Sequence, residues 1–338
     1  MAKPAAEGAV KEMRVQEALR ETLRYEMARD NRVFVMGEDV ALFGGAYGIT
    51  RGLMQEFGQD RVRDTPISEA ALVGLAVGAA INGMRPVVEI QFSDLLPLPM
   101  DQLASHAARY HYMTGGRINV PMVVRTKFAT RAGGGPSHSS CNHGAFIHFP
   151  GLKIIMPTTP ADAKGLLLSA IRDPNPVLCF ESHYLYGVRG PVPEGDYTVP
   201  IGVAAVRREG KDLTIVTCGG MVLKADNAAE ALKQKGIDIE IVDLRSLAPL
   251  DKEMILRSVA KTKRALVLDE GPMIGGLSAE IAAMIQENLF SDLKGPVVRV
   301  AAQPIPPPHS PPLVDAMIPD VDQIIDAVMR LAEGGKIS

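Results

Sequence analysis

The sequence predicts an α/β protein with two domains, each built around a largely parallel β-sheet. Segments with apolar residues at helical spacing alternate with short runs rich in β-branched residues. A Gly- and Pro-rich stretch, YGVRGPVPEGDYTVPIG, interrupts this alternation near the middle of the chain. Of the 338 residues, 46% are hydrophobic and 22% are charged, which fits two hydrophobic cores and excludes a disordered or fibrous protein.

The first domain is predicted to span residues 1–190 and to begin with a loose tail. Apolar residues at helical spacing over 15–30 predict the first helix, and RVFVMGEDV predicts the strand after it. The pattern continues with helices over 71–83, 100–113 and 161–173 and with strands over 85–92, 120–126, 152–157 and 176–182. Continuous apolar strands between helices are typical of a parallel sheet that is covered on both faces.

Residues 191–203 are predicted to be a linker, and residues 204–338 a second α/β domain. Its strands are expected over 212–219, 237–244 and 264–270, and its helices over 224–236, 252–262 and 278–290. A proline-rich segment, QPIPPPHSPP, and a final helix close the chain.

Charge, hydropathy and cysteine usage exclude several classes of protein. The net charge is −3 with both signs dispersed, so no nucleic-acid or acidic-membrane surface is expected. No apolar run approaches the roughly 20 residues that span a bilayer, and the first residues lack the apolar core of a signal peptide, which predicts a cytoplasmic protein. The three cysteines form no CxxC pair and are expected to be reduced and structural. Glycine-rich cradles for dinucleotides or nucleoside triphosphates are missing.

Ligands of open α/β sheets bind outside the carboxyl ends of the strands, so the loops there form the candidate site. Glu69 stands in DTPISEAA, directly before the apolar run LVGLAVGAAING. It is either a first-turn acid after an N-cap at Ser68 or a buried acid with a chemical role, because an unpaired buried carboxylate is costly. His138, in the loop AGGGPSHSSCNHG, is either a solvated surface histidine or an acid/base group, and the other histidines, including His143, rank below it.

Several motifs in a fixed order extend over nearly the whole chain. They are GEDV, GAYGITRGL, RVRDTPISEAALVGLAVGAAINGMRPVVEIQF, the YMTGG turn, HSS, PGLKIIMPTTPADAKGLLLSAIRDPNPV, VDLRSLAPLD and a GG-x-SAEI stretch. Together they resemble the beta subunit of the thiamine-diphosphate-dependent, decarboxylating component of 2-oxo acid dehydrogenase complexes, a family with pyruvate, branched-chain and acetoin members. The resemblance implies a transketolase-like pyrimidine-binding domain followed by a transketolase C-terminal-like domain.

The resemblance also implies roles for individual residues. The acid of the family's TPISE motif, here Glu69, hydrogen-bonds N1′ of the cofactor's aminopyrimidine. His138 matches the histidine of the HSQ or HSS loop, which is implied to assist reductive acylation of a lipoyl group. Leu95 matches the position of an aromatic contact to the aminopyrimidine, and it keeps apolar contact without ring stacking. A structural potassium ion is implied at five backbone carbonyls, which could equally form a plain turn: those of Met122, Ala170, Ile171, Asp173 and Asn175.

The GDG…N motif that holds magnesium and the cofactor diphosphate is absent from the sequence. The resemblance therefore implies that a separate alpha subunit mainly holds those groups, in a heterotetramer of two alpha and two beta chains. The chain would then be one subunit of an oxidoreductase that is active only with alpha. This enzyme would pass an acyl group to the lipoyl acyltransferase core, and the C-terminal domain would serve assembly and docking.

Three questions stay open at this level. The substrate is pyruvate, a branched-chain 2-oxo acid or acetoin. A non-catalytic assembly subunit of the same fold is the second hypothesis, although a scaffold needs neither Glu69 nor His138. A self-sufficient single-chain transketolase-like enzyme is disfavoured by the missing diphosphate motif.

Overall fold

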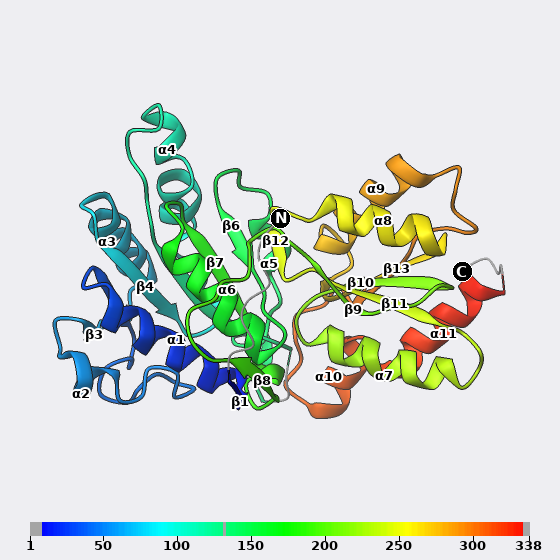
Figure 1. Ribbon diagram of the computed structural model, residues 1–338, viewed down its shortest axis with the longest axis horizontal. Coiled ribbons are helices and arrows are strands. Elements are labelled where there is room, and N and C mark those ends of the chain that lie inside the picture. The colour runs from blue at the N-terminus through cyan, green and yellow to red at the C-terminus, as the bar shows by residue number, and fades with distance from the viewer. Residues whose placement is uncertain (1–8, 131–132, 334–338) are drawn as a thin grey trace. The chain divides into compact units, whose positions relative to one another are not determined.

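The computed structural model describes residues 9–130 and 133–333 (Figure 1). The chain forms two compact units. The N-terminal unit comprises Met1–Lys127 and Phe149–Ile201, and the C-terminal unit comprises Phe128–His148 and Gly202–Ser338. Residues 128–148 therefore belong to the C-terminal unit although segments of the N-terminal unit flank them in sequence. The sequence-based domain boundaries at residues 190 and 204 stay a prediction.

The sheet of the N-terminal unit has the strand order β6-β7-β5-β4-β2-β3 within the described residues. β2 pairs in parallel with β3 and β4, β4 with β5, and β6 with β7. Their buried apolar runs confirm the predicted parallel sheet. The bounds of the strands are β2 (Val33–Gly37), β3 (Val62–Asp64), β4 (Arg85–Ile90), β5 (Val123–Phe128), β6 (Lys153–Ile155) and β7 (Val177–Ser182).

A separate two-stranded antiparallel sheet joins β1 (Val10–Arg14) to β8 (Arg189–Pro193). The sequence does not predict this sheet, and β8 overlaps the first residues of the expected linker. Pro191 and Pro193 lack backbone N–H groups, and a two-stranded sheet tolerates them because each strand has an unpaired edge.

One long helix of the N-terminal unit begins with a side-chain cap that the sequence supplies. Thr159 caps α6 (Pro160–Arg172), since its Oγ1 accepts a hydrogen bond from Asp162 N at 3.0 Å. α6 packs against α1 (Val15–Arg29), and α3 (Glu69–Ile81) packs against β4. The shorter elements are α2 (Leu53–Phe57), the 3₁₀ turns η1 (Ser93–Leu95) and η4 (His183–Leu185), the π-helical turn η2 (Gln102–Ala107) and α4 (Tyr110–Met113).

The continuous α-helix predicted over 100–113 is wrong in one respect. The chain there forms η2 and then α4, because the Ala108 N–H donates to Leu103 O, five residues back, at 3.0 Å. A hydrogen bond of that span is the π-helical pattern.

The sheet of the C-terminal unit has the order β14-β13-β10-β11-β9, with β9 antiparallel to β11 and the other pairs parallel. Figure 1 shows α7 and α11 on one side of this sheet and α8 and α9 on the other. The sequence predicts β10, β11, β13 and their helices but misses β9, β14 and α10. The bounds are β9 (Ala205–Arg208), β10 (Leu213–Thr217), β11 (Ile239–Asp243), β12 (Ser246–Ala248), β13 (Ala265–Pro272), β14 (Val298–Ala302), η3 (Gly135–Ser137), α5 (His143–Phe146), α7 (Met221–Lys233), α8 (Lys252–Thr262), α9 (Leu277–Leu289), α10 (Pro311–Met317) and α11 (Val321–Ala332).

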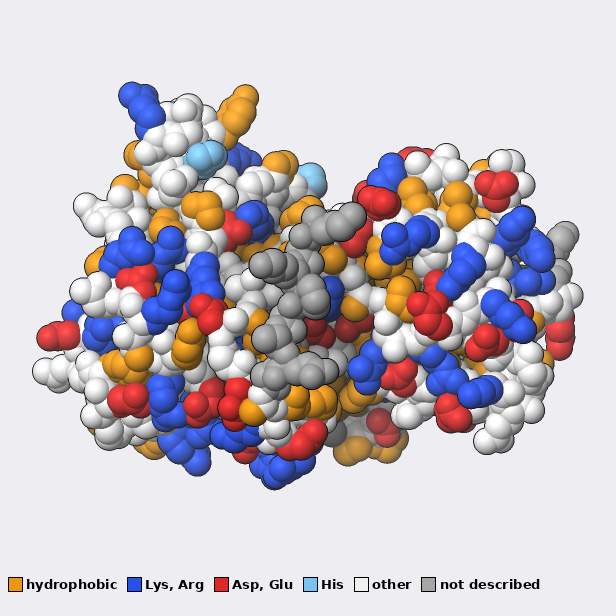
Figure 2. All heavy atoms as spheres, viewed as in Figure 1, with side chains coloured by type: hydrophobic (Ala, Val, Ile, Leu, Met, Phe, Trp, Pro, Cys, Tyr) orange, Lys and Arg blue, Asp and Glu red, His pale blue; other side chains and the backbone are white. Residues whose placement is uncertain are grey.

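The molecular surface carries both signs of charge. Figure 2 shows Lys and Arg side chains interspersed with Asp and Glu on the face in view. None of the helices formed by residues 9–130 and 133–333 is both long enough and apolar enough to span a bilayer.

Candidate cofactor and catalytic site

The carboxyl end of β2 leads into a loop that other strands hold in place. Gly37 ends the strand where a Cβ would lie 2.7 Å from Glu89 O, so this close approach requires glycine. Asp64, at the end of β3, accepts the backbone N–H groups of Ala41 and Leu42 at 2.7 and 3.3 Å. These contacts fix the GEDVAL segment beside the sheet edge where ligands of this fold class bind.

Glu69 is the first residue of α3 and is only 5% exposed. The helix that follows is almost entirely apolar, and Ser68 precedes it at the N-cap position. The Ser68 side chain makes no capping hydrogen bond to any residue that the structure describes. Glu69 is therefore a first-turn acid that the fold also buries. Among the described residues the Ser68 side chain does not cap the helix, and the chemical role of Glu69 stays a prediction.

A second carboxyl group faces the same region. Burial, and then the charge of Glu69, raises the pKa of the Glu38 carboxyl group, which follows β2 directly. Two carboxylates that repel each other bind a proton or a hydrogen-bond donor more readily than separate ones. A nitrogen heterocycle that shares a proton with a carboxyl group would fit this pair.

Leu95 ends the turn η1, which follows the carboxyl end of β4, and it is half-buried. Phe92, just before the turn, packs against the Lys127 ammonium, with 4.3 Å between Nζ and the ring centroid. The Tyr47 ring lies 5.7 Å from the same nitrogen. The sequence analysis identified Leu95 but neither Lys127 nor its aromatic neighbours.

A buried charge network crosses the centre of this sheet. Arg125 Nε and Nη2 donate to the two carboxylate oxygens of Glu181 at 2.7 and 2.8 Å, and its Nη1 donates to Glu89 Oε2 at 2.9 Å. The Tyr186 hydroxyl donates to Glu181 Oε2 at 2.8 Å. These side chains, with Tyr47 and Lys127, line a small cavity at the carboxyl ends of the strands.

The charges of this network support one another. Burial raises the pKa of Glu89, and it raises the pKa of Tyr186 as well. Burial opposes the charge of Arg125, but Glu181 and Glu89 outweigh it and raise the guanidinium pKa. The sequence signal for this network is a charged residue in the middle of an otherwise apolar strand, as in PVVEI, VVRT and LCFES.

His138 follows η3 in the C-terminal unit and is exposed. Its Nδ1 lies 2.8 Å from Ser137 Oγ, which orients the ring. Glycine at position 134 lets the turn pack against Ser139, because a Cβ there would lie 1.8 Å from Ser139 Oγ. The loop therefore presents an oriented imidazole to solvent, which is an arrangement suited to proton transfer.

Close to His138 lies a buried pair that the sequence analysis passed over. His143 Nε2 and Asp269 Oδ1 are 3.0 Å apart, and each side chain is 1% exposed. Glu69 belongs to the N-terminal unit, whereas His138, His143 and Asp269 belong to the C-terminal unit.

Comparison with known proteins places the chain in a family. The family model "Transketolase, pyrimidine binding domain" matches residues 11–188, and "Transketolase, C-terminal domain" matches residues 202–324. The chain is 42% identical to the 2-oxoisovalerate dehydrogenase subunit beta of Bacillus subtilis, over 94% of this chain and 98% of that protein. It is 40% identical to the acetoin:2,6-dichlorophenolindophenol oxidoreductase subunit beta of the same organism, over 94% and 96%.

A third relative is the pyruvate dehydrogenase E1 component subunit beta of Rhizobium meliloti, 43% identical over 94% of this chain and 69% of that protein. The chain belongs to this family of dehydrogenase beta subunits. The resemblance read from the motifs is thereby confirmed, and so is the transketolase-like two-domain fold. A solved structure described as "Split gene transketolase, inactive beta4 tetramer" has the same fold, with a TM-score of 0.79, 22% identity, and coverage of 95% of this chain and 99% of that one.

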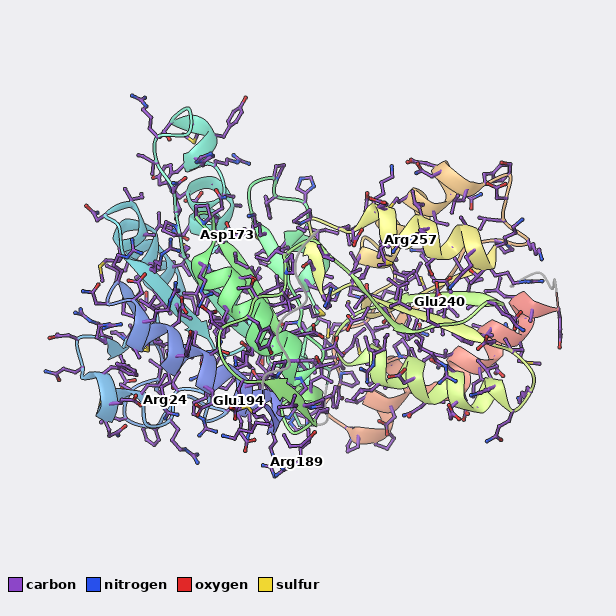
Figure 3. The ribbon with its side chains drawn as sticks, viewed as in Figure 1. Arg24, Asp173, Arg189, Glu194, Glu240 and Arg257 are labelled. Atoms are coloured by element: carbon purple, nitrogen blue, oxygen red, sulfur yellow. The ribbon has the colours of Figure 1, made fainter. Side chains whose placement is uncertain are left out.

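Within this dehydrogenase beta subunit, two of the five predicted potassium ligands accept hydrogen bonds from an arginine. Arg85 Nη1 donates to Ile171 O at 2.6 Å and to Asp173 O at 3.2 Å, and Lys153 Nζ lies 2.5 Å from Asp173 Oδ2. Figure 3 labels Asp173, which follows α6. A carbonyl oxygen has two lone pairs, so these bonds leave one acceptor position at each oxygen. The charge of Arg85 nevertheless opposes a further cation at Ile171 and Asp173.

Of the remaining three predicted ligands, two accept backbone hydrogen bonds, and the third follows Asp173 in the same turn. Met122 O accepts from Val177 N at 2.9 Å, Ala170 O accepts from Asp173 N at 3.3 Å, and Asn175 follows in the same turn. Both interpretations of this segment, the cation site and the plain turn, stay predictions. Residues 9–130 and 133–333 contain no group of three or more His, Cys, Asp or Glu side chains that could hold a metal ion.

The three cysteines of this beta subunit, Cys141, Cys179 and Cys218, are free and buried. Burial, followed by the charge of Glu270, raises the pKa of the Cys141 thiol well above its usual value. A thiol that resists ionisation is a poor nucleophile, which favours the expected structural role of Cys141.

Proposed function

We propose that this chain is the beta subunit of a thiamine-diphosphate-dependent 2-oxo acid dehydrogenase component. Together with an alpha subunit it would decarboxylate pyruvate or a branched-chain 2-oxo acid and transfer the acyl group to a lipoyl group of the partner acyltransferase. The observation that carries the proposal is Glu69, an acid buried at the start of an apolar helix beside Glu38, in a chain of this family.

The proposed role of Glu69 is to hold the cofactor's aminopyrimidine. Its carboxyl group would hydrogen-bond N1′, and the apolar residues of α3 would keep water from competing for that bond. Leu95 would contribute apolar contact to the same ring. When bound, thiamine diphosphate supplies the electron sink that cleavage of the bond next to the carbonyl needs.

The proposed role of His138 is proton transfer during acylation of the lipoyl group. Ser137 Oγ lies beside Nδ1, so Nε2 points away from that hydroxyl and can face an arriving substrate. A histidine can deliver a proton near neutral pH to a thiolate that forms when the dithiolane opens.

The proposed partners follow from what the chain lacks in sequence. Magnesium and the diphosphate of the cofactor would be held mainly by the alpha subunit, in a heterotetramer of two alpha and two beta chains, because the GDG…N motif is absent. A structural potassium ion is a weaker element of the proposal. A cytoplasmic location is part of it as well, since three free thiols are typical of a reducing compartment.

The test uses the chain co-expressed with its alpha subunit and supplied with thiamine diphosphate and magnesium. Pyruvate, 2-oxoisovalerate and acetoin are offered in turn, with reduction of 2,6-dichlorophenolindophenol as the readout. One of the three should give activity that needs both chains, and Glu69→Gln should abolish it without preventing assembly.

Glu26→Gln is the matched control. Glu26 is also a buried acid of the N-terminal unit, but its carboxylate pairs with Arg172 and Arg29. This variant should lose stability and keep activity. Normal turnover by Glu69→Gln would refute the mechanism and favour a non-catalytic assembly subunit.

Acetoin cleavage is the second candidate activity. It is favoured by the acetoin-oxidoreductase beta subunit of Bacillus subtilis, which is about as similar to this chain as the 2-oxoisovalerate dehydrogenase subunit. Dye reduction with acetoin alone, and not with either 2-oxo acid, would select it.

A further inference from the structure

The segment that carries His138 is built into the C-terminal unit. It comprises residues 128–148, and the strands β5 and β6 precede and follow it in sequence. Among the described residues of the C-terminal unit, three groups of contacts hold the segment, and His138 lies between them.

The first contact is made by the proline-rich segment QPIPPPHSPP. Gly133 N donates to His309 O at 3.1 Å. Gly135 has a φ of +64°, and a Cβ there would lie 3.4 Å from His309 Cδ2. The glycine-rich part of the loop therefore rests against the backbone and ring of His309.

The second contact is made by Glu270 on β13. Its Oε1 accepts from Thr130 N at 2.9 Å, and Thr130 Oγ1 donates to Ser139 O at 3.1 Å. Cys141 Sγ lies 3.8 Å from the same hydroxyl. Glu270 is thus linked, through Thr130, to the backbone carbonyl of Ser139, the residue after His138.

The third contact is the pair of His143 and Asp269. His143 Nε2 lies 3.0 Å from Asp269 Oδ1, which also accepts from Gly271 N at 2.9 Å. The His143 ring packs edge-on against Phe128, with 6.0 Å between centroids. A Cβ at Gly271 would lie 3.1 Å from His143 Cε1, so a side chain there would press against the ring.

The surroundings shift the pKa values of both groups in the direction that favours their charged forms. Burial disfavours the imidazolium of His143, but Asp269 and then Glu270 outweigh it and raise the pKa of the imidazole. Burial disfavours the Asp269 carboxylate too, yet His143 and the Gly271 N–H lower its pKa overall. Of the other ionisable groups nearby, Cys141 and Glu270 have pKa values raised by burial, and Lys224 interacts with Glu270.

We propose that His143 and Asp269 act as positioning residues that form a latch between the His138 loop and β13, and that this latch sets His138 for acyl transfer. The inference rests on the proposed role of His138. It gives the C-terminal unit a part in the chemistry in addition to assembly and docking.

A role in positioning explains why the pair is ionic. A buried ion pair stabilises a fold little more than apolar side chains of the same volume, because its desolvation offsets its attraction. An ion pair does impose direction and distance, and it joins His143, after the loop, to Asp269 within β13. The His143 ring also contacts Phe128, which precedes the loop. His138, five residues before His143, has to be held at a fixed position and orientation to transfer a proton.

The test measures two rates on the complex with the alpha subunit. One is dye reduction with the 2-oxo acid that the wild type accepts, which requires decarboxylation only. The other is reductive acylation of the lipoylated domain of the acyltransferase. Asp269→Asn keeps the side-chain shape and removes the charge, and the ratio of acylation to dye reduction should fall by about 10- to 100-fold, the loss that a displacement of about 1 Å can cause.

Glu240→Gln is the matched control. Glu240, labelled in Figure 3, is a buried acid on β11 of the same unit. It accepts from Ser258 Oγ at 2.5 Å and pairs with Lys261, away from the His138 loop. This variant should lose stability while its ratio of rates stays at the wild-type value.

The pH profile supplies a readout that a loss of stability does not move. The ion pair exists below the raised pKa of His143 and is lost as pH rises through it, so the wild-type ratio should decline on the alkaline side. Asp269→Asn should move that decline to lower pH. His143→Gln, which does not titrate, should remove the part of the decline that the ion pair causes and leave the part that comes from proton delivery by His138. It serves as the second variant if Asp269→Asn fails to assemble.

The outcomes separate the latch from the function on which it rests. If His138→Ala acylates the lipoyl domain normally, the role of His138 is wrong and the latch is overturned with it. If His138→Ala loses acylation but Asp269→Asn behaves like Glu240→Gln in ratio and pH profile, the proposed function stands and the latch alone is refuted.

Discussion

Arg125 is the residue whose removal should disturb the N-terminal unit most. Its side chain is 1% exposed and donates three hydrogen bonds, of 2.7 to 2.9 Å, to Glu181 and Glu89. Arg125→Met fills a similar volume with apolar atoms and leaves both carboxylates buried without their cation. The free energy of unfolding of this variant therefore reports the cost of burying two acids on one sheet.

The expected loss of stability is large. Removing one partner of a buried ion pair costs about 3–5 kcal/mol, because the charge that remains is neither solvated nor neutralised. For a unit of this size, 1 kcal/mol corresponds to about 2–4 °C in Tm, so the variant should melt about 6–20 °C lower. Burial already raises the pKa of Glu89, and loss of Arg125 removes an opposing charge and raises it further. A carboxyl group whose pKa is raised in the folded state stabilises the fold at a pH below its unfolded-state pKa, and this contribution is lost as pH rises. The loss of stability in Arg125→Met should therefore be smaller at pH 5 than at pH 8.

Thermal unfolding followed by circular dichroism at several pH values measures this. Arg208→Met is the control, because Arg208 pairs with the mostly exposed Glu230 at 3.1 Å and should lose no more than about 1 kcal/mol. If Arg125→Met and Arg208→Met melt at the same temperature at pH 8, the carboxyl groups around Arg125 are already neutral, and the charged network described above is wrong.

Three further predictions concern the site loops and the thiols. Gly134→Ala places a Cβ 1.8 Å from Ser139 Oγ, so it should displace the His138 loop and lower lipoyl acylation at least about tenfold, more than it lowers dye reduction; equal losses in both rates would contradict this. Leu95→Phe should restore a ring contact to the aminopyrimidine worth about 0.5–1.5 kcal/mol, measured as about a 2- to 12-fold lower Kd for thiamine diphosphate in the complex; an unchanged Kd would show that residue 95 does not touch the ring. The three cysteines should react with a disulfide reagent only as fast as the protein unfolds, because burial raises the pKa of each thiol; rapid labelling of any of them in the folded complex would contradict its burial.

The predictable part of the fold is the part with local periodicity. The local pattern of VFVMG predicts a strand and that of ALVGLAVGAAI predicts a helix, and the structure has β2 and α3 there. The sheet of β1 and β8 pairs residues far apart in sequence, such as Arg14 and Arg189, so no local pattern predicts it. The π-helical turn η2 was not predicted for another reason, since a short run of i to i−5 hydrogen bonds, such as the one from Ala108 N to Leu103 O, barely changes the spacing of apolar residues.

The predictable part of the site is likewise the part that a short motif carries. Glu69 stands out because it is an acid directly before a long apolar run, and His138 because it follows three glycines. Arg125, Glu89 and Glu181 left only a weak signal, one charge inside each apolar strand, and their pairing depends on the strand order β7-β5-β4.

His138 and His143 show why a candidate site residue is easier to predict from the sequence than the residues that position it. Both lie in one short stretch, and sequence reasoning ranked the exposed one first because a glycine-rich loop can admit a substrate. The partner of the buried one, Asp269, is 126 residues further along the chain, so nothing near His143 in sequence distinguishes a packed histidine from an ion-paired one. A proton donor on a loop has to be held in place by other residues, and here one of those residues, Asp269, is distant in sequence. A glycine-rich loop with a candidate acid/base residue is therefore a reason to look for a buried charge pair at its ends, and here the pair of His143 and Asp269 is found at the exit.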